Sequence, residues 1–167
     1  GESDKNTVTI DTSGGKVDVT FDDLKSDASD KGKAAVRVEG GHDATIELDG
    51  DNKLKSGSHN AGLEKNGNES SGKLTIKDDN DTKGSLTAKG GEGGGAGIGG
   101  GIKSTGSSIT IRGGTIKAVG GSNAAGIGDG AGRATGPTDD PNPGDLYICG
   151  DAEVTAKAGS QMTDAKA

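Results

Sequence analysis

Acidic residues recur at the turn after the first strand-like segment of each repeat, and carboxylates spaced in this way could bind a metal ion. If the repeats stack, these side chains lie along one edge, where like charges repel unless a cation bridges them. Ca²⁺ takes about six to eight oxygen ligands and would be the natural bridge. We therefore consider calcium as a cofactor, with these candidate ligands: Asp49, Asp51, Asp78, Asp79 and Asp81.

The familiar calcium-binding motifs are absent from these turns. The chain has no tandem Gly-Gly-x-Gly-x-Asp, and a loop that starts at Asp49, Asp78 or Asp79 lacks the Glu that closes an EF-hand loop. Solvated acidic turns are therefore the favoured alternative to a calcium-bridged edge.

Residues that could perform catalysis are few and scattered. Asp139 and Asp140 lie in the longest loop, residues 130–144, but neighbours in sequence point apart and a loop tip is solvated. His42 and His59 have no Cys or Ser partner in the repeat register, and Cys149 is the single cysteine. A glycosidase needs a pair of carboxylates held across a cleft. We therefore expect the chain not to be an enzyme.

A column of hydroxyl side chains forms the candidate ligand face. Thr9, Thr45, Thr75 and Thr110 stand at the middle of successive strand-like segments, and Tyr147 follows in the last repeat. Outward hydroxyls could bind sugars, and we take Thr45, Thr75, Thr110 and Tyr147 as the candidates. Only Tyr147 and Phe21 are aromatic, and we expect Phe21 to point inward, which weakens a sugar site because such sites use aromatic rings. An ice-binding face is a weaker alternative, since charged residues border the column.

The segments that position these residues are short strands. Apolar side chains alternate with polar ones over three to five residues, which is the period of a strand with one buried face. The 34 glycines destabilise helices and supply positive-φ corners for turns. Each unit is predicted as strand, turn, strand, Gly-rich turn, small-residue strand and loop. The units span residues 8–41, 42–71, 72–106, 107–144 and 145–167.

A small-residue motif appears four times, at Ala34-Ala35-Val36, Ala61-Gly62-Leu63, Ala96-Gly97-Ile98 and Ala125-Gly126-Ile127, at intervals of 27, 35 and 29 residues. Repeats of this length indicate a stacked array. Three strands per unit favour a coil that turns three corners, so we predict an all-β, three-sided right-handed parallel β-helix (β-solenoid) of about four to five coils. A phosphate-binding Gly loop at residues 90–97 is disfavoured because it lacks the Lys-Ser/Thr of a P-loop.

The solenoid hypothesis predicts which side chains form each inward column. The first wall is expected to bury Val8, Ala44, Leu74, Ile109 and Leu146 with Ile10, Ile46, Ile76, Ile111 and Ile148. The second is expected to bury Val17, Leu54, Leu86, Ile116 and Val154. The third presents Ala34, Ala61, Ala96 and Ala125 with Val36, Leu63, Ile98 and Ile127, and its small residues predict a wall that lies close to the others.

Composition limits the classes of function. The apolar fraction is 27% and the net charge is −7. The low apolar fraction is compatible with a solenoid, because its narrow, repetitive core needs few apolar residues. Acidity argues against nucleic acid as a partner, and no apolar run is long enough for membrane insertion. We expect a single domain, residues 1–167, cut from a longer chain, with neighbouring domains of that chain as partners.

Two Gly-rich passages resemble a known class of repeat. Residues 96–101 and 108–121 look like the Gly-rich β-helix repeats of secreted or wall-anchored proteins of Gram-positive bacteria. The segment 44–54 is similar to a bacterial family of carbohydrate-binding β-helix domains. The resemblance implies a right-handed parallel β-helix, an extracellular or cell-surface location, and binding of polysaccharide or host glycan together with calcium. We therefore expect a non-catalytic carbohydrate-binding or adhesive module, with a passive spacer or stalk as the alternative.

Overall fold

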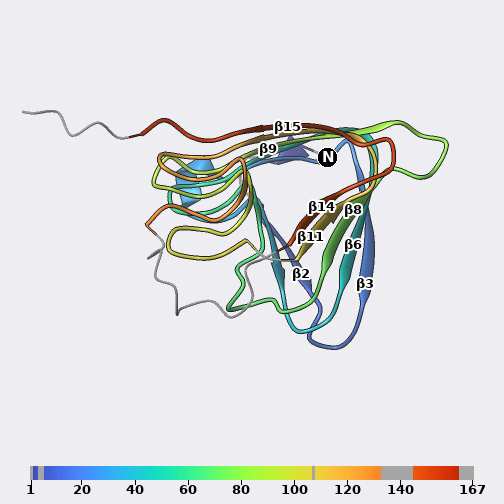
Figure 1. Ribbon diagram of the computed structural model, residues 1–167, viewed down its shortest axis with the longest axis horizontal. Helices are drawn as coiled ribbons and strands as arrows, with labels where there is room; N and C mark the ends of the chain where they lie inside the picture. The colour runs from blue at the N-terminus through green and yellow to red at the C-terminus, as the bar shows by residue number, and fades with distance from the viewer. Residues whose placement is uncertain (1, 4–5, 107, 133–144, 162–167) are drawn as a thin grey trace, which may run out of the picture.

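The chain folds as an all-β parallel solenoid of about four turns, seen in the computed structural model along its stacking axis (Figure 1). The structure describes residues 2–3, 6–106, 108–132 and 145–161. One 3₁₀ turn, Ser29–Lys31, interrupts the strands. The strands are β1 (Glu2–Ser3), β2 (Val8–Asp11), β3 (Val17–Asp22), β4 (Lys25–Asp27), β5 (Val36–Glu39), β6 (Ala44–Lys55), β7 (Leu63–Glu64), β8 (Leu74–Lys77), β9 (Gly84–Lys89), β10 (Ile98–Gly99), β11 (Ile109–Ile111), β12 (Thr115–Val119), β13 (Ile127–Gly128), β14 (Leu146–Ile148) and β15 (Glu153–Lys157).

Three walls of parallel strands enclose the core. Wall A stacks β1, β4, the second half of β6, β9, β12 and β15; wall B stacks β2, β5, β7, β10 and β13; wall C stacks β3, the first half of β6, β8, β11 and β14. Wall A runs along the top of Figure 1 and wall C along its right side. The 12-residue strand β6 belongs to both walls and turns the corner at Gly50, where φ is 64°.

Ladders of equivalent apolar residues fill the space between the walls, as predicted for most of the chain. In wall C, Ile46 pairs with Ile76, and Ile76 pairs with Ile111. In wall A, Leu86 pairs with Ile116, which pairs with Val154. The isoleucines of the middle coils and Leu86 are fully buried, and Phe21 points inward beside Leu48 as expected. Each coil therefore covers the apolar side chains of the coil before it.

The first coil differs from its predicted register. Val8 and Ile10 belong to wall B, where they pair with Val36 and Val38, and not to wall C. Their expected place in wall C is taken by Val17 and Val19 of β3, which pair with Ala44 and Ile46. Val17 is therefore also on a different wall from the one predicted. All these segments carry the same alternating pattern, so the pattern could not assign them to a wall.

A second correction concerns the corner of β6. Leu54 was expected in the column of Leu86, but it pairs with Ala88, and Asn52 occupies the Leu86 column. The Asn52 side chain is buried; its Oδ1 accepts from the Leu24 amide at 2.8 Å. Its Nδ2 lies 3.0 Å from the carbonyl oxygen of Asp49 and 3.1 Å from that of Ser85. The buried amide therefore satisfies backbone groups that a leucine would leave unpaired.

The small-residue motif forms the closely approached wall that the sequence predicts. Leu63, Ile98 and Ile127 stack in wall B. A Cβ at Gly97 would lie 2.5 Å from the carbonyl oxygen of Gly126 in the next coil and 2.5 Å from the amide nitrogen of Val119 in wall A. Real Cβ atoms essentially never come so close, so the glycine is required where walls A and B converge.

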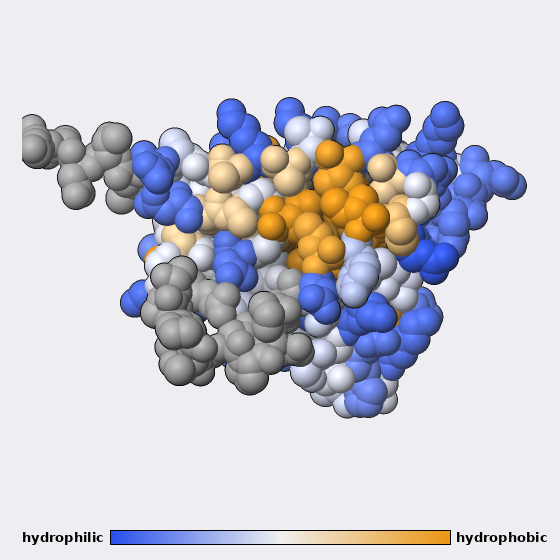
Figure 2. All heavy atoms as spheres, viewed as in Figure 1, coloured by the Kyte–Doolittle hydropathy of each residue, from blue (hydrophilic) through white to orange (hydrophobic). Residues whose placement is uncertain are grey.

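Apolar side chains are exposed at the last described coil. Leu146, Tyr147 and Ile148 of β14 are 43%, 62% and 50% exposed, and Figure 2 shows apolar atoms gathered on this end of the solenoid. Leu146 and Ile148 continue the inward ladder of wall C, but no described strand pairs with the other edge of β14. Among the residues that the structure describes, no helix has the length and apolar character of a membrane span.

Candidate functional site

The outward face of wall C presents the predicted hydroxyl column in register. Thr45 pairs with Thr75, Thr75 with Thr110, and Thr110 with Tyr147. The threonines are half-buried between their neighbours, whereas the Tyr147 ring is 62% exposed at the end of the column. Thr9 is not part of this column, because it lies in wall B beside Arg37. Asp18 of β3 takes its place and pairs with Thr45.

A groove of about 760 Å³ lies over the first three coils of this face. Thr45 and Thr75 lie in its floor, and charged side chains of both signs surround them. The surrounding groups come from β3, β6, β8 and the turns beside them: Lys16, Asp18, Asp43, Glu47, Lys73, Lys77, Asp79, Asn80 and Arg112. The groove is therefore lined by hydroxyl, carboxylate, amide and ammonium groups, and its described lining contains no aromatic ring.

Ion pairs between coils hold the charged side chains of the groove in place. Lys77 Nζ lies 2.7 Å from Glu47 Oε2 in the neighbouring coil and 2.6 Å from Asp79 Oδ1. The hydrogen bond to Asp79, and then the bond to Glu47, raise the pKa of Lys77, while Lys77 lowers the pKa of Asp79. Lys77 and Asp79 therefore stay charged at neutral pH, and the ion pairs fix the positions of all three side chains.

The first coil repeats this arrangement with an acid and a base of its own. Lys16 Nζ lies 3.1 Å from Asp18 Oδ1. Hydrogen bonds from the Thr45 hydroxyl, and then from Lys16, lower the pKa of Asp18. The hydroxyl column and its charged border are therefore linked, and the groove presents polar groups that are already oriented.

The acidic edge predicted from the sequence does not gather into a metal site. Asp49 Oδ1 accepts a hydrogen bond from the side-chain Nδ2 of Asn80 at 2.7 Å. Asp78 Oδ2 accepts one from the backbone amide of Gly84 at 3.1 Å. Asp51 is held by Lys53 Nζ at 2.9 Å and by the Ser85 hydroxyl at 3.1 Å.

Asp79 is bound to Lys77, and Asp81 is exposed in the same turn. Among the described residues, no three His, Cys, Asp or Glu side chains come together as metal ligands. In this structure the five carboxylates therefore do not converge on a common point: four of them contact protein donors, and Asp81 is exposed.

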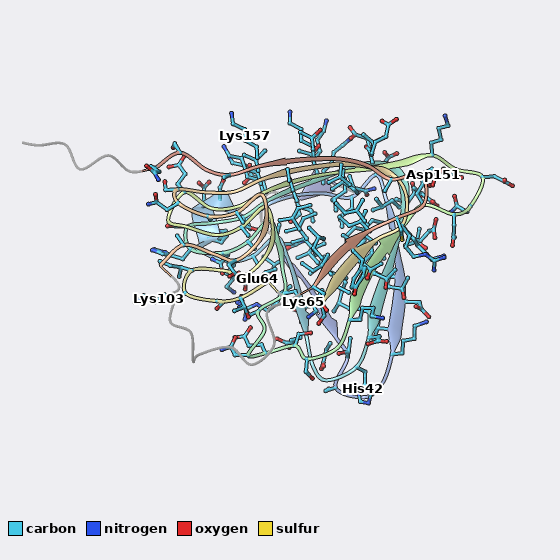
Figure 3. All side chains as sticks on the ribbon, viewed as in Figure 1. His42, Glu64, Lys65, Lys103, Asp151 and Lys157 are labelled. Carbon is cyan, nitrogen blue, oxygen red and sulfur yellow. The ribbon has the colours of Figure 1, made fainter. Side chains whose placement is uncertain are left out.

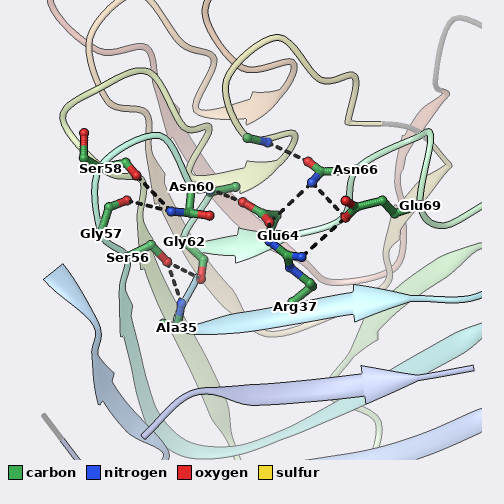
Figure 4. Close-up of polar contacts among 12 residues, drawn as sticks. Ala35, Arg37, Ser56, Gly57, Ser58, Asn60, Gly62, Glu64, Asn66 and Glu69 are labelled. Atoms are coloured by element: carbon green, nitrogen blue, oxygen red, sulfur yellow. Dashed lines mark hydrogen bonds and ion pairs between the residues drawn. The ribbon is translucent and has the colours of Figure 1, made fainter. Parts of the chain in front are cut away.

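A polar cluster, which the sequence did not predict as a site, lies on wall B, where β5 pairs with β7 and the loop after β7 begins (Figure 4). Glu64 Oε1 lies 2.8 Å from Arg37, and its Oε2 accepts from the Ala61 amide at 3.0 Å. Asn66 Nδ2 bridges Glu64 at 3.3 Å and Glu69 at 3.1 Å. Burial raises the pKa of Glu64 although Arg37 and the Ala61 amide oppose that shift.

Lys65 is fully buried beside this cluster. Its Nζ donates to the carbonyl oxygen of Ser70 at 3.1 Å, and burial lowers its pKa to about 8, against the opposing field of Asp43. In this repeat Glu64 and Lys65 directly follow the small-residue motif, and in the first repeat Arg37 does, whereas the next two repeats have Gly99 and Gly128 at that position. That departure from the repeat was the available signal. Glu64, Lys65 and Asn66 are buried and hold their loop by contacts within the protein, whereas Arg37 and Glu69 reach the surface.

The other residues considered for catalysis lie apart from one another. His42 stands in the turn before β6, where its Nδ1 lies 2.7 Å from the Thr12 carbonyl oxygen (Figure 3). Cys149 is an exposed thiol at the end of β14, and His59 is in a turn with φ of 74°. Asp139 and Asp140 lie outside the described residues.

Comparison with known proteins adds no relative. No protein-family model matches the sequence, and neither a curated protein nor a solved structure is significantly similar to it. The case for a function therefore rests on the faces of the solenoid itself.

Proposed function

We propose that the chain is a non-catalytic carbohydrate-binding or adhesive module that uses the outward face of wall C. The observation that supports this most directly is the groove of about 760 Å³ over Thr45 and Thr75. Its hydroxyl groups can donate to and accept from sugar hydroxyls, and the paired carboxylates add acceptors. Lys77 and Lys16 already pair with carboxylates of the protein, so they do not need a charged ligand. The groove therefore suits a neutral, hydroxyl-rich ligand.

Tyr147 supplies the aromatic surface that the groove lacks. The ring is exposed and directly follows Thr110 in the column, so a glycan chain lying along the solenoid axis would pass from the hydroxyls to the ring. Aromatic faces pack against the apolar C–H faces of sugars. One ring gives modest affinity, and we expect useful binding strength to come from several modules acting together.

The resemblance of the Gly-rich coils to surface repeats supports the location of this activity. We propose that the chain belongs to a cell-surface or secreted protein of a Gram-positive bacterium, where host glycans or polysaccharides would be the partners. The parallel solenoid agrees with that resemblance, and a rigid stack of coils is also what a spacer or stalk would use.

The test is a glycan array probed with the wild-type protein and with two variants, Thr75→Val and Tyr147→Ala. Binding to a defined group of neutral glycans that both variants weaken would support the proposal. Thr9→Val is the matched control, since Thr9 is exposed at an outward mid-strand position of β2 in wall B, beside Arg37 and outside the hydroxyl column. A blank array, or equal losses in the control, would favour the spacer.

A further inference from the structure

The outward face of wall A collects lysines from every coil of an otherwise acidic chain. The outward positions of β4, of the second half of β6, and of β9, β12 and β15 hold six lysines and three acids, Asp27, Asp51 and Glu153, although the whole chain carries −7. Two adjacent outward columns hold them: Lys25, Lys53, Thr87, Lys117 and Thr155 in one, and Asp27, Lys55, Lys89, Val119 and Lys157 in the other. In the sequence these lysines are spread along the repeats, and the register brings them together.

Three of the lysines form a cluster around Val119. Lys89 and Lys157 pair with Val119 from the coils on either side, and Lys117 lies two residues before it on the same strand. Strand neighbours are about 4.8 Å apart, so the three ammonium groups can reach one ligand. All three side chains are exposed, and Figure 3 shows Lys157 pointing away from the top of wall A.

The lysines of the cluster differ from Lys53 and Lys55 in having no ion-pair partner among the described residues. Lys53 is held by Asp51 at 2.9 Å and Lys55 by Asp27 at 3.0 Å. Within the part of the chain that the structure describes, Lys89, Lys117 and Lys157 make no ion pair. Like charges at this spacing repel, and an anionic ligand would relieve that repulsion.

Hydroxyl groups accompany the cations. Thr87 and Thr155 flank Lys117 in register. A hollow of about 260 Å³ beside Lys55 and Lys89 is lined by Ser29, Ser56 and Ser58, with Glu92 as its acid. A ligand that carries both anionic groups and hydroxyls would find partners for each on this face.

We propose that the outward face of wall A binds an acidic polysaccharide, a chain of sugars with carboxylate or sulfate groups. An extended glycan lying along the solenoid axis would place anionic groups near Lys89 and Lys157, with Lys117 beside them. Nucleic acid fits less well, because the described outward residues of wall A include no aromatic ring on which a base could stack. This face is separate from the groove on wall C, so each can fail without the other.

The test is binding of dextran sulfate and of polygalacturonate, measured at about 50 mM and about 500 mM NaCl, with uncharged dextran and duplex DNA for comparison. We expect at least one acidic polysaccharide to bind at low salt and to be released at high salt, while dextran does not bind. The triple variant Lys89→Gln, Lys117→Gln, Lys157→Gln should lose about tenfold or more in affinity, because each removed cation removes counterion release.

A second triple variant, Lys33→Gln, Lys83→Gln, Lys103→Gln, removes the same charge from exposed positions outside both the cluster and the wall C groove and should keep the affinity. The Arg version of the first triple should also keep it, and thermal melts should show both Gln variants folded. The proposal is overturned if neither polysaccharide binds at low salt, if both Gln triples lose affinity equally, or if duplex DNA binds more tightly than either polysaccharide.

Discussion

Walls A and C are built from the same kind of strand, yet their outward faces differ in charge and in how that charge is used. On wall C, Glu47 of one coil pairs with Lys77 of the next, and Lys77 also binds Asp79. On wall A, lysines stand next to lysines, and Lys89, Lys117 and Lys157 lack an acid within the described residues. Core packing limits the inward positions to a few apolar residue types. The outward positions do not pack in the core, so their side chains can differ between walls and can suit different ligands.

Both outward faces belong to one rigid solenoid. Gly97→Ala tests this rigidity and has the largest expected effect on stability. The added Cβ would meet backbone atoms of the next coil and of wall A at 2.5 Å. Backbone cannot move aside cheaply, so we expect a loss of about 3 kcal/mol or more in unfolding free energy, measured by chemical denaturation.

Gly14→Ala is the matched control for this change. A Cβ at Gly14 would have no atom within 4 Å, so that variant should stay within about 0.5 kcal/mol of the wild type. Gly97→Ala should also weaken ligand binding on both walls together. A stable Gly97→Ala protein would contradict the convergence of walls A and B.

The fold was predictable because the inward ladders repeat the same residue types in every middle coil. Ile46, Ile76 and Ile111 could be placed on one wall from the sequence alone, and Gly97 could be placed where the walls converge. The first coil was not predictable in this way, since Val8 and Val17 begin equivalent alternating segments. Which wall a strand joins depends on where the chain turns, and that information is not local.

The functional faces were harder to predict than the fold. The hydroxyl column from Thr45 to Tyr147 follows from aligning the repeats, whereas Asp18 in place of Thr9 follows only from the true register. Predicting the lysine cluster requires the register of wall A. Lys89 and Lys157 are far apart in the sequence, yet both pair with Val119. Outward residues carry no repeating pattern that would announce such a cluster.

Lys65 differs from the lysines of walls A and C because its ammonium group is buried. Its pKa is about 8 in the folded protein and about 10.5 when unfolded, so the unfolded chain binds the extra proton between these values. Unfolding free energy should therefore rise as pH increases from about 8 to about 10.5, by about 3 kcal/mol. Lys65→Met should flatten this rise, as measured by denaturation across that range.

The other groups that titrate in this range are present in both proteins, so the difference between wild type and Lys65→Met isolates the buried lysine. If the two proteins show the same dependence on pH, the ammonium group of Lys65 is not desolvated in the fold. A larger rise in the variant would contradict the assigned direction.

A smaller effect should separate the two outward faces. Lys77→Met removes the cation that pairs with both Glu47 and Asp79 and leaves these two acids uncompensated, so its thermal midpoint should fall. Lys117→Met removes a cation from a cluster of like charges and should leave the midpoint unchanged or raise it. Adding salt should shrink the difference, because these charges are at the surface. Equal losses in both variants would mean that the two faces do not differ in their use of charge.

The smallest expected effect concerns calcium at the corner between walls C and A. The question is whether the carboxylates there already have hydrogen-bond or ion-pair partners within the protein. Asp49, Asp51, Asp78 and Asp79 each accept a hydrogen bond from, or pair with, a group of the protein. A calcium ion would have to replace several of these contacts to gather enough oxygens. We therefore expect thermal melts in excess calcium and in excess chelator to coincide. A higher midpoint in calcium that Asp49→Asn abolishes, while Asp30→Asn at an exposed position elsewhere does not, would show that a bridging cation outcompetes the protein's own donors at this edge.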